Sequence, residues 1–218
     1  MEIWSVLVGE APYLFKGLLI TIQLLIGLLS VGLIGGVLLS VVEVYGNRIL
    51  STIAVLIQRG LRAIPALVLL FLSYYALDLP PLIISIIALG LRSSAYQSQI
   101  FRGAIQSIKS GQMMAARSMG MNRLQGIWYV VLPQAVRLAI GPWSNEYASE
   151  TKDTSLAYVV GVVEIMRRSR YIISYTYGNA LLIYAIVALI YFFLTRAGNV
   201  LLYRLEEKLW VPGLERRN

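Results

Sequence analysis

The sequence predicts an all-α integral membrane protein, and three observations support that prediction. Hydrophobic residues make up 58% of the 218-residue chain and charged residues 14%, whereas about 25% of a typical soluble domain is charged. Residues 18–42 form a run of 25 residues without a charge, longer than the roughly 18 that indicate a membrane-spanning helix. Residues 180–195 form a second uncharged run. Because lipid offers no partner for backbone N–H and C=O groups, such spans are expected to be helical.

We expect about five transmembrane helices in a single domain that covers residues 1–218. They lie near residues 14–44, 63–78, 80–101, 137–163 and 178–203. The first and the fifth contain the two uncharged runs. In the first span, glycines at positions 27, 32, 35 and 36 are expected to let another helix approach closely.

The second and third spans are separated from their surroundings by proline. Arg59 and Arg62 interrupt the apolar residues before the second span, so we expect an amphipathic helix followed by a short span, with Pro65 near the join. Pro80 and Pro81 form the turn into the third span, because neither proline can continue the preceding helix.

The positions of lysine and arginine predict an outside N-terminus and an inside C-terminus in the cytoplasmic membrane. In that orientation twelve of the nineteen basic residues face the cytoplasm, Arg216 and Arg217 of the tail among them, as the positive-inside rule favours. Only Lys16, Arg167, Arg168 and Arg170 lie outside. The three arginines either lie in a solvated loop or bind acidic residues of a partner protein. The net charge of +8 then indicates contact with anionic membrane lipid, and nucleic acid is not an expected partner.

The composition argues against catalysis by this chain. Histidine and cysteine are absent, which removes the commonest general base and the commonest metal ligands. No Gly-rich loop ending in Lys-Ser or Lys-Thr occurs, so the chain is not expected to bind nucleotide phosphates. We therefore expect neither an enzyme nor a metal site.

The expected cytoplasmic loop, residues 102–136, contains the basic sequence SGQMMAARSMGMNRLQGIWYVVLP. Residues 112–119 are good helix formers without β-branching, and Gly120 is expected to end that helix in the left-handed conformation. Asn122 is a good N-cap for a second helix that is expected to stop before Pro133. Such a hairpin between membrane spans is expected to pack against another protein. A hairpin lying on the lipid surface is the alternative.

This loop resembles the EAA loop of ABC-transporter permeases, which docks on the ATPase subunit. Met114 stands where that family usually has Glu. The chain is similar to the polar amino-acid uptake branch (His/Glu/Gln/Arg/opine type) from about residue 14 to residue 208. The resemblance is carried by residues 95–137, Lys-Asp-Thr-Ser-Leu at 152–156, Val-Gly-Val at 160–162 and Arg-Ala-Ile-Pro at 62–65.

The resemblance implies the fold of a type I ABC importer permease with a cytoplasmic coupling-helix hairpin. Two permease subunits, as a homodimer or a heterodimer, pair with ATPase subunits, and an extracytoplasmic substrate-binding protein delivers an amino acid. ATP and Mg belong to the ATPase, and this chain holds no cofactor. The residues expected to couple to the ATPase are Gly111, Ala115, Ala116, Arg117, Gly120 and Pro133. The small alanines would let the helix lie close in a groove of its partner.

Three charged residues within the expected spans are candidates for substrate binding, because an ionisable group in a bilayer is costly unless it has a partner. Arg92 interrupts the third span, and Glu146 and Glu150 lie four residues apart in the fourth, on one helix face. Arg92 would bind an α-carboxylate, and either glutamate an ammonium or a cationic side chain. The alternative is an Arg92–Glu150 ion pair that fixes helix packing.

These observations predict the transmembrane subunit of an ATP-driven importer of a polar or charged amino acid that works by alternating access. The alternative is an ion-coupled secondary transporter of small polar solutes. Inverted repeats or paired broken helices would favour that alternative, and the sequence shows neither.

Overall fold

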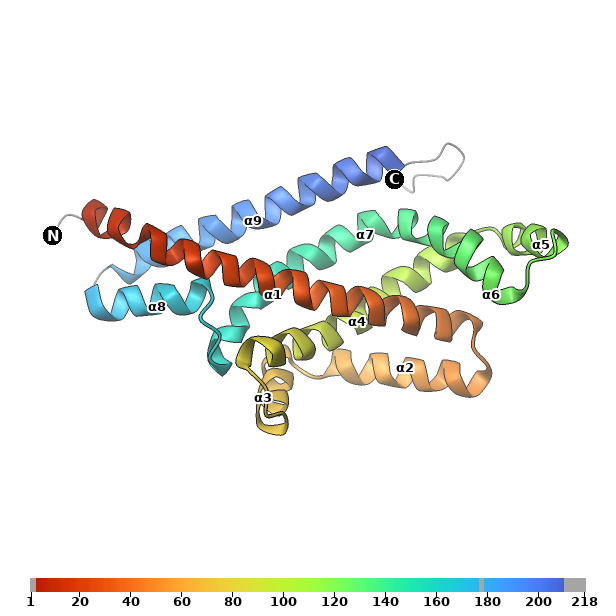
Figure 1. Cartoon of the computed structure of the whole chain (residues 1–218), viewed down its shortest axis with the longest axis horizontal. Coiled ribbons are helices and arrows are strands. Elements are labelled where there is room, and N and C mark those ends of the chain that lie inside the picture. Colours follow the sequence, from red (N-terminus) through yellow and green to blue (C-terminus); the bar gives the residue numbers. More distant parts are fainter. Residues whose placement is uncertain (1–2, 177–178, 210–218) are drawn as a thin grey trace.

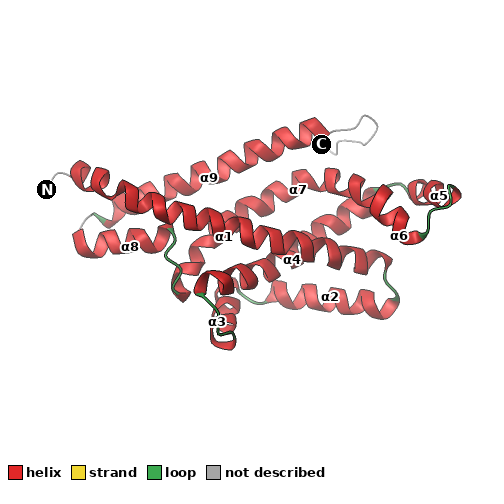
Figure 2. Cartoon of the chain, viewed as in Figure 1, coloured by secondary structure: helices red, strands yellow, loops and turns green. Residues whose placement is uncertain are grey.

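The computed structural model describes residues 3–176 and 179–209, and in that part every regular element is a helix (Figure 2). The predicted all-α fold is therefore confirmed. Arg216 and Arg217 lie outside the described residues. The elements are α1 (Ile3–Tyr45), α2 (Arg48–Ala63), α3 (Ala66–Ala76), α4 (Pro81–Ser107), α5 (Ser110–Ser118), α6 (Arg123–Gly126), the π-helical turn η1 (Ile127–Val131), α7 (Leu132–Asp153), the 3-10 turn η2 (Thr154–Val160), α8 (Ile165–Thr176) and α9 (Ala180–Leu209).

The molecule is elongated, and its two ends carry different parts of the chain (Figure 1). Helices α1, α4, α7 and α9 run along the long axis. Helices α5 and α6 lie at one end, and α8 lies at the other end with the start of α1. Helix α2 lies alongside the second half of α1, whereas α3 projects across the long axis.

Among the described residues, two helices are long and apolar enough to cross a membrane, one over Gly9–Tyr45 and the other over Ala180–Leu209. Helices α2 and α3 would together make a third, but they are bent by 102° at the break between them. The break is at Ile64, whose backbone is extended, and Pro65, where the sequence predicts the join. Helices α4 and α7 fall on the third and fourth expected spans. The assignment of five spans stays a prediction.

The centre of the fold is the close packing of α1 against α4. Leu24, Leu28 and Leu89 are fully buried there. A Cβ placed on Gly32 would lie 2.4 Å from Nε2 of Gln97, and one placed on Gly36 would lie 2.7 Å from its Cβ. Only a residue without a side chain permits this approach, so the predicted role of the glycines in the first span is confirmed.

The helix after the hairpin does not stop before Pro133, and that prediction is wrong. Helix α6 continues through the η1 turn into α7 without a break in helical backbone. The N–H of Leu132 donates to the carbonyl of Ile127, five residues back, which makes the turn wider than an α-helical one. Pro133 directly follows this wide turn, in which the hydrogen bonds already depart from the i to i−4 pattern that proline would disrupt.

Candidate functional site

A buried polar cluster joins the middle of α4 to the C-terminal half of α7. In its centre Nη1 of Arg92 lies 2.9 Å from Oδ2 of Asp153 and 3.9 Å from Oε1 of Glu150. The guanidinium carbon of Arg92 also lies 5.0 Å from the ring centroid of Tyr96, in cation–π contact. The ion pair between Arg92 and Glu150, expected as the alternative to substrate binding, is thus present. Asp153 is nevertheless the closer partner, in an ion pair that joins α7 to α4.

Glu146 extends the cluster along the same face of α7. The hydroxyl of Ser93 donates to Oε1 of Glu146 at 3.0 Å and accepts from Nε2 of Gln97 at 3.1 Å. The indole N–H of Trp143 in turn donates to Oε1 of Gln97 at 2.8 Å. Ser93 and Gln97 are fully buried, and their spacing of four residues was the signal that could have identified them.

The cluster contains more acid than base. Glu146, Glu150 and Asp153 face the single guanidinium of Arg92. Two atoms in it, Nε of Arg92 and Oε2 of Glu150, are buried without a hydrogen-bond partner among the described residues. A buried polar atom without a partner costs about 1–3 kcal/mol. A ligand that carries both a donor and an acceptor would satisfy both atoms.

A groove of about 690 Å³ lies on α9, next to the end of α7 and the start of α8. Its wall is mainly apolar, with residues such as Val187 and Phe192, and its charged members are Lys152 and Arg196. Lys152 lines this groove, whereas its neighbour Asp153 pairs with Arg92. Adjacent residues on a helix point about 100° apart, so the two side chains do not form one contact site.

The hairpin of α5 and α6 closes as the sequence predicts. Gly120 has φ +87°, in the left-handed region. The N–H of Met121 donates to the carbonyl of Ala116 at 3.2 Å, in the manner of a Schellman cap. Asn122 caps α6, since its side chain accepts from the N–H of Gln125, whose own side chain accepts from the N–H of Asn122. This capping box fixes the entry into α6.

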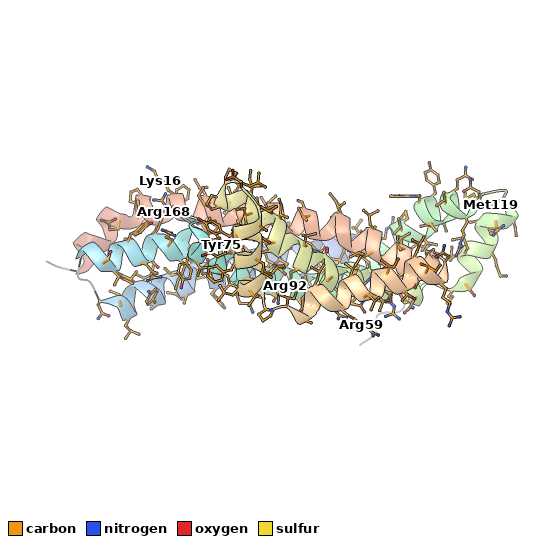
Figure 3. All side chains as sticks on the ribbon, turned by 90° about the horizontal axis from the view of Figure 1, so that it is seen from below. Lys16, Arg59, Tyr75, Arg92, Met119 and Arg168 are labelled. Carbon is orange, nitrogen blue, oxygen red and sulfur yellow. The ribbon has the colours of Figure 1, made fainter. Side chains whose placement is uncertain are left out.

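Five large, mainly apolar side chains of the hairpin and of η1 are exposed. The exposed fractions of the large side chains there are 68% for Met114, 70% for Met119, 67% for Leu124, 59% for Trp128 and 73% for Tyr129. We call these five residues the tip patch. Figure 3 shows Met119 at this end of the molecule, far from Arg168 at the other.

The coupling residues expected from the sequence divide into two groups. Gly111, Ala115, Arg117, Gly120 and Pro133 are exposed. Ala116 is fully buried, and its Cβ would lie 3.7 Å from a Cβ placed on Gly126. Ala116 therefore lies between α5 and α6 and shapes the hairpin, so the expected contact of its side chain with a partner groove is not possible in this conformation.

The basic residues at the opposite end are held by tyrosines. Their guanidinium carbons lie 4.1–5.5 Å from tyrosine ring centroids, in the pairs Arg167–Tyr171, Arg168–Tyr13 and Arg170–Tyr158. Lys16 is close to Arg168 in Figure 3. The nearby carboxylate of Glu164 is buried and accepts from the N–H groups of Met166 and Arg167 at 2.8 Å.

Comparison with known proteins gives one family and several close relatives. The model of the family "binding-protein-dependent transport system inner membrane component" matches residues 30–211. The probable amino-acid permease protein YxeN of Bacillus subtilis is 33% identical over 208 residues, covering 91% of this chain and 92% of the relative. The glutamine transport system permease protein GlnP of Escherichia coli K12 is 32% identical over 215 residues, covering 94% and 97%.

Two solved structures have the same fold. A crystal structure of an amino acid ABC transporter with histidines matches with a TM-score of 0.83 and 29% identity, covering 95% of this chain and 99% of the other. An inward-facing structure of the MetNI methionine ABC transporter matches with a TM-score of 0.73 and 20% identity, covering 95% and 98%. The second likeness concerns the fold alone.

Proposed function

This chain belongs to the family of binding-protein-dependent transport system inner membrane components, and from that membership we propose that it is the transmembrane subunit of an ATP-driven amino-acid importer. The observation that carries the proposal is the family match over residues 30–211, together with relatives of nearly the same length that are named as amino-acid permeases. The partners would be an ATPase subunit, a second permease subunit and an extracytoplasmic substrate-binding protein.

The tip patch supports the ATPase as the partner at the hairpin. Contiguous apolar side chains exposed to water typically mark an interaction surface. Here they lie on a hairpin stiffened by the Gly120 turn and the Asn122 capping box. Met114 adds apolar surface where a carboxylate is usual in the family, and Arg117 remains free to meet an acidic group. With the hairpin inside, the C-terminus of α9 is inside and the start of α1 is outside.

Arg92, Glu146 and Glu150 are the residues that we propose contact the transported amino acid. The excess of carboxylates in the cluster favours a solute with an ammonium group. Glu146 is only partly buried and would reach the solute directly, whereas Glu150, 1% exposed, would act from behind it. Because Nη1 of Arg92 is already paired with Asp153, its other N–H groups, the unpartnered Nε among them, are left for a carboxylate oxygen of the solute.

The test is import by the reconstituted complex. Proteoliposomes with this chain, its ATPase and its binding protein should accumulate a radiolabelled amino acid only when ATP is present. The matched control contains an ATPase that binds ATP but does not hydrolyse it. Accumulation driven by an ion gradient in vesicles that contain this chain alone would contradict the proposal and support an ion-coupled transporter.

The cluster is tested in the same vesicles with Glu150→Leu. This variant should import more slowly while the binding protein keeps its affinity for the amino acid, because the change lies in the permease alone. Wild-type import together with a lower melting temperature would show that Glu150 serves packing and not transport.

A further inference from the structure

Four polar side chains from three helices form a closed ring near the hairpin end of the molecule. They are Glu43 of α1, Gln58 of α2, and Gln99 and Arg102 of α4. Nε of Arg102 lies 3.1 Å from Oε1 of Glu43, and Nε2 of Gln58 donates to Oε2 of Glu43 at 3.0 Å. Nε2 of Gln99 donates to Oε1 of Gln58, and Nη1 of Arg102 donates to Oε1 of Gln99 at 3.5 Å. We call these residues the inner ring.

The inner ring is largely shielded from solvent. Gln58 is 1% exposed and the side chain of Glu43 is 8% exposed, whereas that of Arg102 is 40% exposed. Both carboxylate oxygens of Glu43 are used within the ring. In a low-dielectric surrounding, hydrogen bonds that share partners strengthen one another and fix one geometry. Apolar residues of similar size would stabilise the packing of three helices at least as well. The polar ring therefore contributes a fixed relative orientation of the helices more than it contributes stability.

The ring lies next to the segment that enters the hairpin, and a second contact joins the end of α1 to the hairpin itself. Arg102 lies in the last two turns of α4, which ends at Ser107, and α5 begins three residues later at Ser110. On the other side, the guanidinium carbon of Arg123 in α6 lies 5.5 Å from the ring centroid of Tyr45 at the end of α1. The end of α1 therefore contacts α4, the helix before the hairpin, and α6, the second helix of the hairpin.

We propose that the inner ring is a coupling joint, in which Glu43 and Arg102 are positioning residues for transport. The joint passes a displacement of α5, through α4, to α1 and α2, so that these helices move as one body with the hairpin. The inference rests on the proposed function, because it requires an ATPase that moves the hairpin. Gln58 and Gln99 fix the relative orientation of α1, α2 and α4, since each amide both donates and accepts a hydrogen bond within the ring.

The experiment measures the amount of amino acid imported per ATP hydrolysed, in vesicles containing the whole complex. Glu43→Gln removes the charge that holds Arg102 and should lower this ratio about fivefold or more, the effect of losing a charge-assisted contact. Gln99→Ala should lower it less, since the ion pair stays. The double variant Glu43→Arg with Arg102→Glu restores opposite charges and should recover most of the ratio.

The control is Arg59→Gln, in the residue next to Gln58 but on the exposed side of α2 (Figure 3), which should keep the wild-type ratio. A role in packing alone would reduce the yield of complex and both activities together, leaving the ratio unchanged. If Glu43→Gln assembles poorly, Gln99→Ala decides, because it leaves every charge in place. A wild-type ratio in Gln99→Ala and in those Glu43→Gln complexes that do assemble would overturn the inference. Absence of ATP-driven import by the wild type would instead contradict the proposed function.

Discussion

Substitutions of Gly120 can distinguish two reasons for a glycine at this position, namely the left-handed backbone of the hairpin turn and close contact with a partner protein. Gly120 has φ +87°, and a Cβ placed on it would meet no atom within 4 Å. A side chain therefore fits in the free chain, and the cost of adding one comes from the left-handed backbone. That cost is about 1–2 kcal/mol for a residue with a Cβ, larger for a β-branched residue and smaller for asparagine.

A loss of 1–2 kcal/mol changes the ratio of closed to open hairpin by a factor of about 5–30. We therefore expect Gly120→Val to lower the stimulation of ATP hydrolysis by the loaded binding protein by that factor in the assembled complex. Gly120→Asn should stay within about twofold of the wild type, since asparagine adopts the left-handed conformation readily. The assay is phosphate release in proteoliposomes with and without the binding protein and its amino acid.

The two side chains have similar volumes, so the comparison excludes a simple clash with the ATPase. Equal losses for valine and asparagine would show that the partner needs the empty space beside Gly120. No loss for valine would show that the Gly120 turn has no part in coupling. Either result would refute the argument from backbone strain.

Three further changes test other parts of the fold. Gly198→Leu should lower the melting temperature of the purified complex, because a Cβ there would lie 2.1 Å from the ring of Tyr147. Overpacking of this kind costs about 1–3 kcal/mol of folding free energy. An unchanged melting temperature would mean that α7 and α9 separate freely. Asp153→Asn should slow import about tenfold, as the loss of a charge 2.9 Å from the guanidinium on α4 predicts, and wild-type import would remove this residue from the site. Trp128→Ala in the tip patch should weaken ATPase binding about tenfold or more in a pull-down titration, whereas Leu181→Ala, 79% exposed at the other end, should not; equal binding by both variants would contradict the assignment of the patch.

The parts of this fold that depend on local chemistry could be predicted from the sequence. Uncharged runs predict helices because lipid leaves the backbone no other partner. Gly120 and Asn122 predict the ends of the hairpin helices because their preferences arise within one turn of chain. The glycines of the first span predict close packing, although not which helix packs there.

The remaining features depend on contacts between distant segments. Pro133 ends a helix by local rules, yet the wide η1 turn before it lets the helix continue. The partner of Asp153 could not be predicted, because its distance to Arg92 is set by how α4 and α7 cross. Ala116 looks like a contact residue by size, but Gly126 from α6 covers it. The inner ring likewise combines residues up to 59 positions apart in the chain, from Glu43 to Arg102, and no periodicity links them.

The π-helical turn η1 joins α6 to α7, so any displacement that passes between these two helices passes through it. Helices α6, η1 and α7 form one continuous helical segment. Its start carries the exposed Leu124 and Trp128, and its second half carries Glu146 and Asp153. The π-helical turn and Pro142 inside α7 are the points at which this segment can bend. If the proposed function holds, a displacement of α6 by the ATPase would reach Glu146 and Asp153 through both of these points.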